Sequence, residues 1–256
     1  MLPAEPMEQH LSRLRRAIAK SEALPEQVRP LALGVPGIDT ALGGGLARAA
    51  LHELSAAPLH LGAAAGFALT LSALSARAEK AKQILWIATD FGMLETGALY
   101  GPGLDLIGLP AERLLVAHVA KPVDALFAME EALKCRALSC VIVEMTEDAD
   151  LTATRRLSLA AREGGALGLL LRHKATAAPS AAMTRWQVAA APSQPDEFGG
   201  LGRTAFALTL TRNRHGICGA WTIAWDHHEH AFSALSLGVA EAASDRPDRE
   251  PLEHAG

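Results

Sequence analysis

Long, almost uninterrupted apolar runs are the feature that most limits which folds this 256-residue chain can adopt. Residues 84–87 read Ile-Leu-Trp-Ile, and residues 141–143 read Val-Ile-Val. A strand that carries apolar side chains on both of its faces is buried on both sides, which is typical of a parallel sheet covered by helices. Half of the chain is hydrophobic but only 4% is aromatic, so the core consists mainly of aliphatic side chains. The sequence therefore predicts an α/β protein.

Strand-like and helix-like stretches alternate from residue 50 onward. The expected strands are 51–55, 83–88, 113–118, 139–145 and 167–171, and the expected helices lie near 62–80, 93–107, 122–137 and 152–163. For the last helix, Thr152 is the expected N-cap, and Gly164 with Gly165 is the expected stop. Three more strand-like stretches follow without helices between them, at 184–190, 204–212 and 217–225. This pattern predicts a mixed sheet, in which antiparallel strands joined by a hairpin at 213–216 extend a parallel core flanked by helices.

The chain is too short for two full domains, so we expect one core domain over residues 31–235. A separate helix and linker are expected at residues 1–30, where Leu11, Leu14 and Ile18 share one face. This helix either packs on its own core or binds a neighbouring subunit. Residues 236–256 are expected to form a disordered tail. No signal sequence and no run of 18 apolar residues is visible, so we expect a cytoplasmic protein without membrane contact.

A glycine-rich run at residues 34–46 precedes the first expected strand. This run is followed by the strand at 51–55 and then by an alanine-rich stretch. That order resembles the start of a RecA-like core, which has a P-loop NTPase fold. In that fold a phosphate loop ends in Gly-Lys-Ser/Thr, whose lysine contacts the β- and γ-phosphates and whose hydroxyl binds Mg²⁺. The corresponding stretch here contains Gly62 and then Gly66, Phe67 and Ala68. The resemblance therefore implies a RecA-like fold whose phosphate loop is degenerate.

Two carboxylates at the ends of expected strands match further parts of a RecA-like site. Glu144 occupies the place of an aspartate that holds the metal's water shell, and Asp90 falls roughly where a glutamate activates water. Without the lysine, both carboxylates would repel a triphosphate. Lys80 and Lys82 cannot replace it, because they would lie about 20 Å from the loop along the helix. We therefore expect vestigial carboxylates, no catalytic residue, no cofactor and no metal. For Glu144, a solvated or capped strand end is the alternative.

Positive charge is concentrated between residues 152 and 214, which carry nine Lys/Arg against three Asp/Glu in a chain of net charge −4. RecA-like recombinases bind DNA through two loops that follow neighbouring strands. The first corresponding interval here, 145–150, is short and acidic, whereas the second, 172–180, is basic. The DNA-contact candidates are therefore Arg155, Arg156, Arg172 and Lys174. A solvated basic surface, or one that faces an acidic partner, is the alternative.

Three further motifs indicate which family of RecA-like proteins the sequence resembles. Residues 99–104 read LYGPGL, residues 151–157 read LTATRRL, and residues 184–193 read TRWQVAAAPS. In this order they resemble the ImuA family, RecA-like proteins of bacterial damage-inducible (SOS) mutagenesis cassettes, over residues 34–232. The resemblance implies a non-catalytic accessory protein of error-prone translesion DNA synthesis.

The partners that this resemblance implies are an ImuB-type inactive Y-family polymerase homologue, an error-prone C-family polymerase, RecA and single-stranded DNA. Self-association through the N-terminal helix is a further expectation. Two alternatives stay open at this point: a DNA-dependent ATPase with a divergent nucleotide site that uses Glu144 and Asp90, and a module that binds single-stranded DNA directly.

Overall fold

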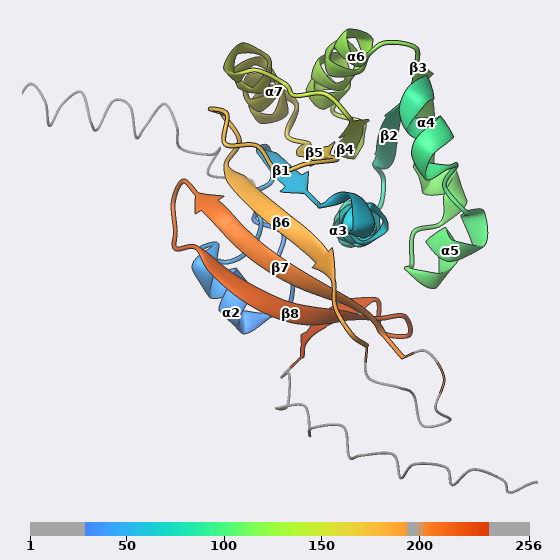
Figure 1. Ribbon diagram of the computed structural model, residues 1–256, viewed down its shortest axis with the longest axis vertical. Helices are drawn as coiled ribbons and strands as arrows, with labels where there is room; N and C mark the ends of the chain where they lie inside the picture. The colour runs from blue at the N-terminus through green and yellow to red at the C-terminus, as the bar shows by residue number, and fades with distance from the viewer. Residues whose placement is uncertain (1–28, 194–199, 201, 236–256) are drawn as a thin grey trace, which may run out of the picture.

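The structure is a computed structural model, and it describes residues 29–193, 200 and 202–235. The described residues form one sheet of nine strands in the order β3-β2-β4-β5-β1-β6-β7-β8-β9 (Figure 1). Its parallel part consists of β1 (Leu51–Ser55), β2 (Gln83–Thr89), β3 (Leu114–Val119), β4 (Leu138–Met145), β5 (Leu167–Arg172) and β6 (Thr184–Ala190). The antiparallel part adds β7 (Thr204–Asn213), β8 (Gly219–Asp226) and β9 (Ala231–Ala234).

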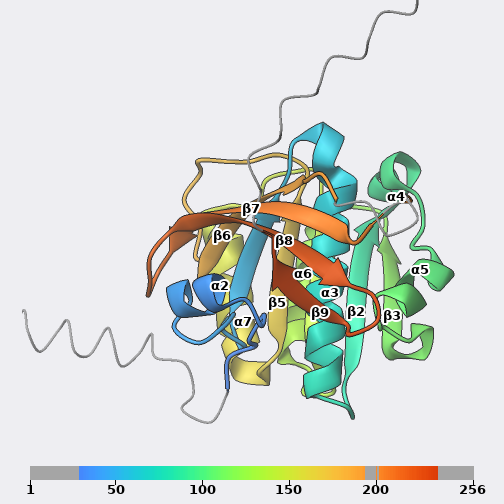
Figure 2. The ribbon, with the colours of Figure 1, turned by 90° about the horizontal axis from the view of Figure 1, so that it is seen from below.

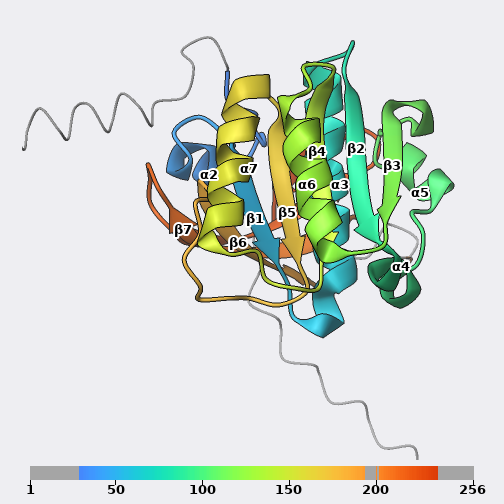
Figure 3. The same ribbon diagram turned by 90° about the horizontal axis from the view of Figure 1, so that it is seen from above.

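Helices cover both faces of the parallel part. On one face lie α6 (Pro122–Lys134) and α7 (Leu151–Gly164), and on the other lies α3 (Leu61–Ala78), as Figure 3 shows. Shorter helices are α2 (Pro36–Ala41), α4 (Asp90–Thr96) and α5 (Gly101–Leu106), with single 3₁₀ turns η1 (Pro58–His60) and η2 (Ala111–Arg113). The α/β architecture and the mixed sheet that the sequence predicts are confirmed.

The central strands are buried along their whole length. Every residue of β1, β4 and β5 is buried, because each of these strands lies between two neighbours and under helices on both faces. Strand β3 lies at the edge of the sheet, and its side chains are only partly covered. The continuous apolar runs of the sequence are thus explained by position in the sheet.

The antiparallel strands curve around α3, so this helix is enclosed by more than the parallel sheet (Figure 2). Phe67 of α3 lies 6.5 Å from the ring of Trp186 in β6, 5.6 Å from Phe206 in β7 and 5.7 Å from Phe232 in β9. By length and composition the segment Pro58–Ala78 is apolar enough to cross a membrane, but half of it is buried inside the protein. We therefore interpret it as a core helix.

The glycine-rich run before β1 folds as a turn followed by α2. The carboxylate of Asp39 accepts hydrogen bonds from the backbone N–H groups of Leu33 and Gly34, at 2.8 and 2.9 Å. Gly45 has a φ of 134°, and a Cβ there would lie 2.5 Å from the carbonyl oxygen of Leu31, so the position requires glycine. This short helix was not expected from the sequence.

Three local expectations were wrong. The helix expected at 93–107 is two helices, α4 and α5, because Gly97 takes a φ of 82° between them. The N-cap of α7 is Asp150, whose carboxylate accepts from the Ala153 N–H at 2.7 Å, and not Thr152. Strand β9 was not expected at all. The stop of α7 is confirmed, since Gly165 ends it at a φ of 84°. The expected N-terminal helix and C-terminal tail lie outside the described residues.

Candidate functional site

The connection between β1 and α3 is the segment in which a phosphate loop would lie. It consists of residues 56–60, which read Ala-Ala-Pro-Leu-His, and α3 begins at Leu61. Gly66, Phe67 and Ala68 lie inside α3, where Phe67 and Ala68 are buried against the sheet. The prediction that these three residues form the end of the loop was therefore wrong. The loop is shorter, starts earlier, and contains no glycine.

The first turn of α3 supplies none of the side chains that a triphosphate requires. Its residues are Leu61, Gly62 and Ala63, and His60, the residue before them, makes no capping hydrogen bond through its side chain. Backbone N–H groups at a helix start attract anions, but a phosphate site of the P-loop type adds a lysine and a hydroxyl. The nearest lysines along the chain, Lys80 and Lys82, lie beyond the opposite end of α3, as expected.

A cavity of about 500 Å³ adjoins this first turn at the carboxyl end of the parallel strands. Its walls include Pro58, Leu61 and Gly62 from the β1–α3 segment, and Trp86 from β2. Glu144 of β4 also lines it, so the expectation that this carboxylate reaches the vestigial pocket holds. None of the described residues that line the cavity is a lysine or an arginine. Ligands of α/β proteins bind at this end of the sheet, so the cavity is the candidate site.

Glu144 is almost completely buried, and one of its oxygens already has a partner. It is 6% exposed, and its carboxylate lies 2.9 Å from Nε2 of His173, the first residue after β5. Of the alternative, a solvated or capped strand end, the solvated form is wrong, whereas the capped form agrees with the contact between the carboxylate and the His173 imidazole. Asp90 is the first residue of α4, is exposed, and does not line the cavity. The structure therefore does not bring the two vestigial carboxylates together at one site.

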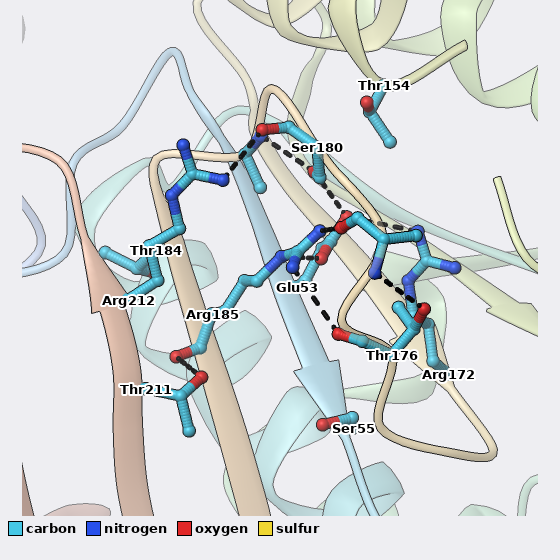
Figure 4. Close-up of polar contacts among 12 residues, drawn as sticks. Glu53, Ser55, Thr154, Arg172, Thr176, Ser180, Thr184, Arg185, Thr211 and Arg212 are labelled. Carbon is cyan, nitrogen blue, oxygen red and sulfur yellow. Dashed lines mark hydrogen bonds and ion pairs between the residues drawn. The ribbon is translucent and has the colours of Figure 1, made fainter. Parts of the chain in front are cut away.

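A buried ionic cluster centred on Glu53 lies on the α7 face of the sheet (Figure 4). One oxygen of Glu53 accepts from Nη2 of Arg172 at 3.1 Å and from the Ser180 hydroxyl at 2.6 Å. The other lies 2.7 Å from Nε of Arg185. The side chains of Glu53 and Arg172 are 4% and 3% exposed. Sequence reasoning missed this cluster, because Arg172 and Ser180 lie 119 and 127 residues from Glu53 along the chain.

The Glu53 cluster fixes the segment that crosses from β5 to β6. This segment, residues 173–183, passes over β1, which lies between the two strands. Arg185 donates to the carbonyl oxygens of Thr176 and Ala178, and Arg212 donates to that of Ser180 at 3.1 Å. Arg172 also pairs with Asp148 at 3.0 Å, in the segment that follows β4. Both intervals that correspond to the DNA-binding loops of recombinases are therefore tied to the protein interior.

The four DNA-contact candidates do not form one surface. Arg172 is buried within the Glu53 cluster, so a DNA phosphate cannot reach it, and its assignment as a DNA contact was wrong. Lys174 is 63% exposed but lies 4.0 Å from Asp148. Arg155 and Arg156 are exposed on α7, and Arg156 pairs with Glu130 of α6 at 2.6 Å. Only the α7 pair thus remains a candidate basic surface. The partner-helix candidates Leu11, Leu14 and Ile18 lie outside the described residues.

Two buried titratable groups elsewhere are held in their neutral forms. Burial lowers the pKa of His52 to about 4; its Nε2 contacts the Ala47 carbonyl and its Nδ1 contacts the Thr184 hydroxyl, both at 2.7 Å. Burial likewise raises the pKa of the Cys140 thiol, which keeps it protonated and unreactive. Both groups belong to the core and not to the cavity at the carboxyl end.

A larger cavity of about 870 Å³ lies at the opposite end of the parallel strands. Arg48, Arg77 and Lys82 line it together with Glu79. Glu79 pairs with Arg48 at 2.7 Å and with Lys82 at 3.6 Å, and Arg77 donates to the carbonyl oxygens of the β8–β9 turn. Arg29 lines the cavity as well, and Nε and Nη2 of Arg48 are buried without a hydrogen-bond partner among the described residues, so its four cations face one carboxylate, that of Glu79.

Comparison with known proteins identifies relatives over most of the chain. No model of a known protein family matches it. Two curated sequences named Protein ImuA, from the Caulobacter vibrioides strains NA1000 and ATCC 19089, are each 32% identical to it over 224 residues. The match covers 80% of this chain and 88% of each relative. With this identity over this length, the chain belongs to the ImuA family.

Proposed function

We propose that this protein is a non-catalytic accessory protein of damage-inducible, error-prone DNA synthesis, which acts by binding other proteins. Membership of the ImuA family supports the context of damage-inducible mutagenesis. The strand order supports descent from a RecA-like core, because β1 lies between β5 and β6 and leads directly into α3. Its proposed partners are an ImuB-type polymerase homologue, an error-prone C-family polymerase and RecA, in the cytoplasm.

The proposal that the protein is not an enzyme rests on the residue types at the start of α3. A triphosphate placed there would meet Leu61, Gly62 and Ala63 in the first turn of the helix, and these residues offer neither a lysine nor a hydroxyl. It would also face Glu144, a carboxylate, in a cavity whose described lining contains His118 but no lysine or arginine. In such a cavity the phosphate charge loses its hydration and gains no cation in return, which disfavours binding.

Calorimetric titration of the full-length protein with ATP and Mg²⁺ tests this proposal. We expect no saturable heat at nucleotide concentrations up to the millimolar range, whereas an active recombinase measured in parallel binds. A dissociation constant in the micromolar range would contradict the proposal. If phosphate release stimulated by single-stranded DNA accompanied that binding and Glu144→Gln abolished it, the protein would be an ATPase.

The adaptor role is tested by co-purification of the full-length chain with each proposed partner expressed separately. We expect at least the ImuB-type protein to be retained at a stoichiometric ratio after size-exclusion chromatography. Retention of none of the partners, singly or together, would remove the adaptor role.

A further inference from the structure

The larger cavity, at the amino end of the parallel strands, is surrounded by segments that are far apart in the chain. Its walls come from residues 29–32, from Arg48 before β1, from the end of α3 and from the end of α7. Figure 3 shows that α3 and α7 both end on this side of the sheet, opposite the arrowheads of β1, β2 and β5. A volume of about 870 Å³ is sufficient for a small-molecule ligand. We refer to this space as the amino-end cavity.

Positive charge prevails in the lining of the amino-end cavity. Arg29, Arg48, Arg77 and Lys82 contribute four cations and Glu79 contributes one carboxylate, which leaves an excess of three positive charges. Glu79 pairs with Arg48 and Lys82, whereas Arg77 donates to backbone carbonyl oxygens. Within the described part of the chain, neither Arg29 nor Arg77 forms an ion pair with a carboxylate. A concave wall lined by cations concentrates positive potential and attracts anions.

Arg48 has hydrogen-bond donors left over for such an anion. Its side chain is 11% exposed, and its Nη1 donates to the carboxylate of Glu79 at 2.7 Å. Its Nε and Nη2 are buried and find no hydrogen-bond partner among the residues that the structure describes. These two nitrogens form one edge of the planar guanidinium, and this edge matches two oxygens of a phosphate or carboxylate group. Unpaired donors on a buried cation are unfavourable, so an oxyanion that accepts from both is stabilised.

The cations of the amino-end cavity are not required as helix caps. Lysine and arginine near the end of a helix often bind its last carbonyl groups. At the end of α3 this role belongs to Arg113, which does not line the cavity and donates to the carbonyl oxygens of Ala76 and Glu79 at 3.4 and 3.0 Å. At the end of α7 the Gly165 N–H donates to the Ala161 carbonyl oxygen at 2.9 Å. The positive charge of the lining therefore remains for a ligand.

We infer that the amino-end cavity binds a small ligand through a phosphate group. Arg48 already lines the cavity, so a rotation about its side-chain torsions presents the Nε–Nη2 edge to two phosphate oxygens. Arg29, Arg77 and Lys82 supply further positive charge around the group. A phosphate group carries up to two negative charges and a carboxylate carries one, so the excess charge of the lining favours phosphate. This site lies at the opposite end of the sheet from the vestigial phosphate loop and is therefore independent of the proposed function.

Calorimetric titration of the full-length protein with sodium pyrophosphate, at low ionic strength and without Mg²⁺, tests this site. We expect saturable binding at one site with a dissociation constant below about 1 mM. Excess Mg²⁺ should weaken the binding, because the bound cation neutralises two charges of the pyrophosphate. A titration with ATP and Mg²⁺ therefore reports on the other end of the sheet. If ATP with Mg²⁺ binds Arg48→Met as tightly as the original chain, that result contradicts the proposed function but leaves the amino-end site.

Substitutions in the lining separate phosphate binding from a folding defect. Arg48→Met should weaken pyrophosphate binding by about tenfold or more, since the two donors of the guanidinium edge are lost. Arg77→Met changes an exposed side chain and should weaken binding by about threefold, whereas Lys121→Met, at an exposed position after β3, should leave it unchanged. Glu79→Gln should strengthen binding by about threefold, because the one carboxylate of the described lining loses its charge. A folding defect cannot produce this gain.

Other results would show that the cavity has a different role. The inference is wrong if the original chain gives no saturable heat, if Arg48→Met binds pyrophosphate as tightly, or if Glu79→Gln binds it more weakly. It is also wrong if citrate binds more tightly than pyrophosphate, because the cavity then selects carboxylates. Displacement of pyrophosphate by a micromolar single-stranded oligonucleotide would assign the cavity to DNA. Displacement by a micromolar synthetic peptide of residues 241–256, which carry five Asp/Glu and two Lys/Arg, would assign it to the chain's own acidic segment. Either displacement overturns the assignment to a small phosphate ligand.

Discussion

Replacing Glu53 by glutamine removes the charge at the centre of the buried cluster and keeps its shape. The carboxylate holds Arg172 at 3.1 Å, Arg185 at 2.7 Å and the Ser180 hydroxyl at 2.6 Å. Each hydrogen bond to a charged group contributes about 1.5–3 kcal/mol, and an amide NH₂ would face one of the two arginines as a second donor. Breaking a buried ion pair on one side costs about 3–5 kcal/mol, because the other charge stays buried. We expect Glu53→Gln to lower the free energy of unfolding by this amount.

Urea denaturation followed by tryptophan fluorescence measures this loss. A matched control is Glu130→Gln, which weakens the pairs with the partly exposed Arg156 and Lys134 and should lower the free energy of unfolding by less than about 1 kcal/mol. Adding Arg172→Met to Glu53→Gln should restore part of the stability, since a buried cation then disappears with its anion. Hydrogen exchange in residues 174–183 should also become faster in Glu53→Gln. A loss below about 1 kcal/mol, or no change in exchange, would refute the view that the cluster fixes this segment.

Three further predictions concern the core and the α7 surface. The pKa of His52 is about 4 in the folded protein and near 6.5 in the unfolded chain, so only the unfolded chain gains a proton between these values. The contribution of neutral His52 to stability is therefore complete above pH 6.5 and is lost as the pH falls towards 4. Between pH 7 and 5 the unfolding free energy should fall by about 2 kcal/mol more than in a His52→Gln variant, as urea denaturation at both values would show. Phe67→Ala should lower the free energy of unfolding by about 3–5 kcal/mol in the same assay, because three aromatic rings lose a contact. Leu59 is exposed, so an equal loss in Leu59→Ala would contradict this explanation. Reversing Arg155 and Arg156 to glutamate should reduce affinity for single-stranded DNA in low salt if α7 binds it; unchanged anisotropy would exclude that surface.

Several parts of the fold could be read from local sequence. The strands β1 and β6 begin and end at the residues expected, and β4 differs by one residue. Such bounds can be predicted because the apolar pattern of a buried strand ends where the strand is no longer covered by helices. The stop of α7 at Gly165 was equally visible, since a left-handed residue after a helix favours glycine. The split between α4 and α5 was missed, because three glycines lie among residues that also fit one helix.

The register of the vestigial phosphate loop could not be read locally. The start of α3 was expected near residue 62 and lies at Leu61, so the error lay in matching Gly66, Phe67 and Ala68 to the end of a phosphate loop. These three residues lie inside the helix, where Phe67 packs among the rings of β6, β7 and β9. A lysine and a hydroxyl are missing in both registers, so the absence of nucleotide binding stays a prediction.

By itself, the sequence determined an α/β fold with a buried parallel sheet, and its family. These properties depend on residue type and local order, which a chain carries before it folds. Only the tertiary structure decided that Arg172 is an internal counterion of Glu53 and not a DNA contact. It alone also placed Glu144 beside His173. Such pairings join residues far apart in the chain, and their energy depends on distance and burial, which no local pattern specifies.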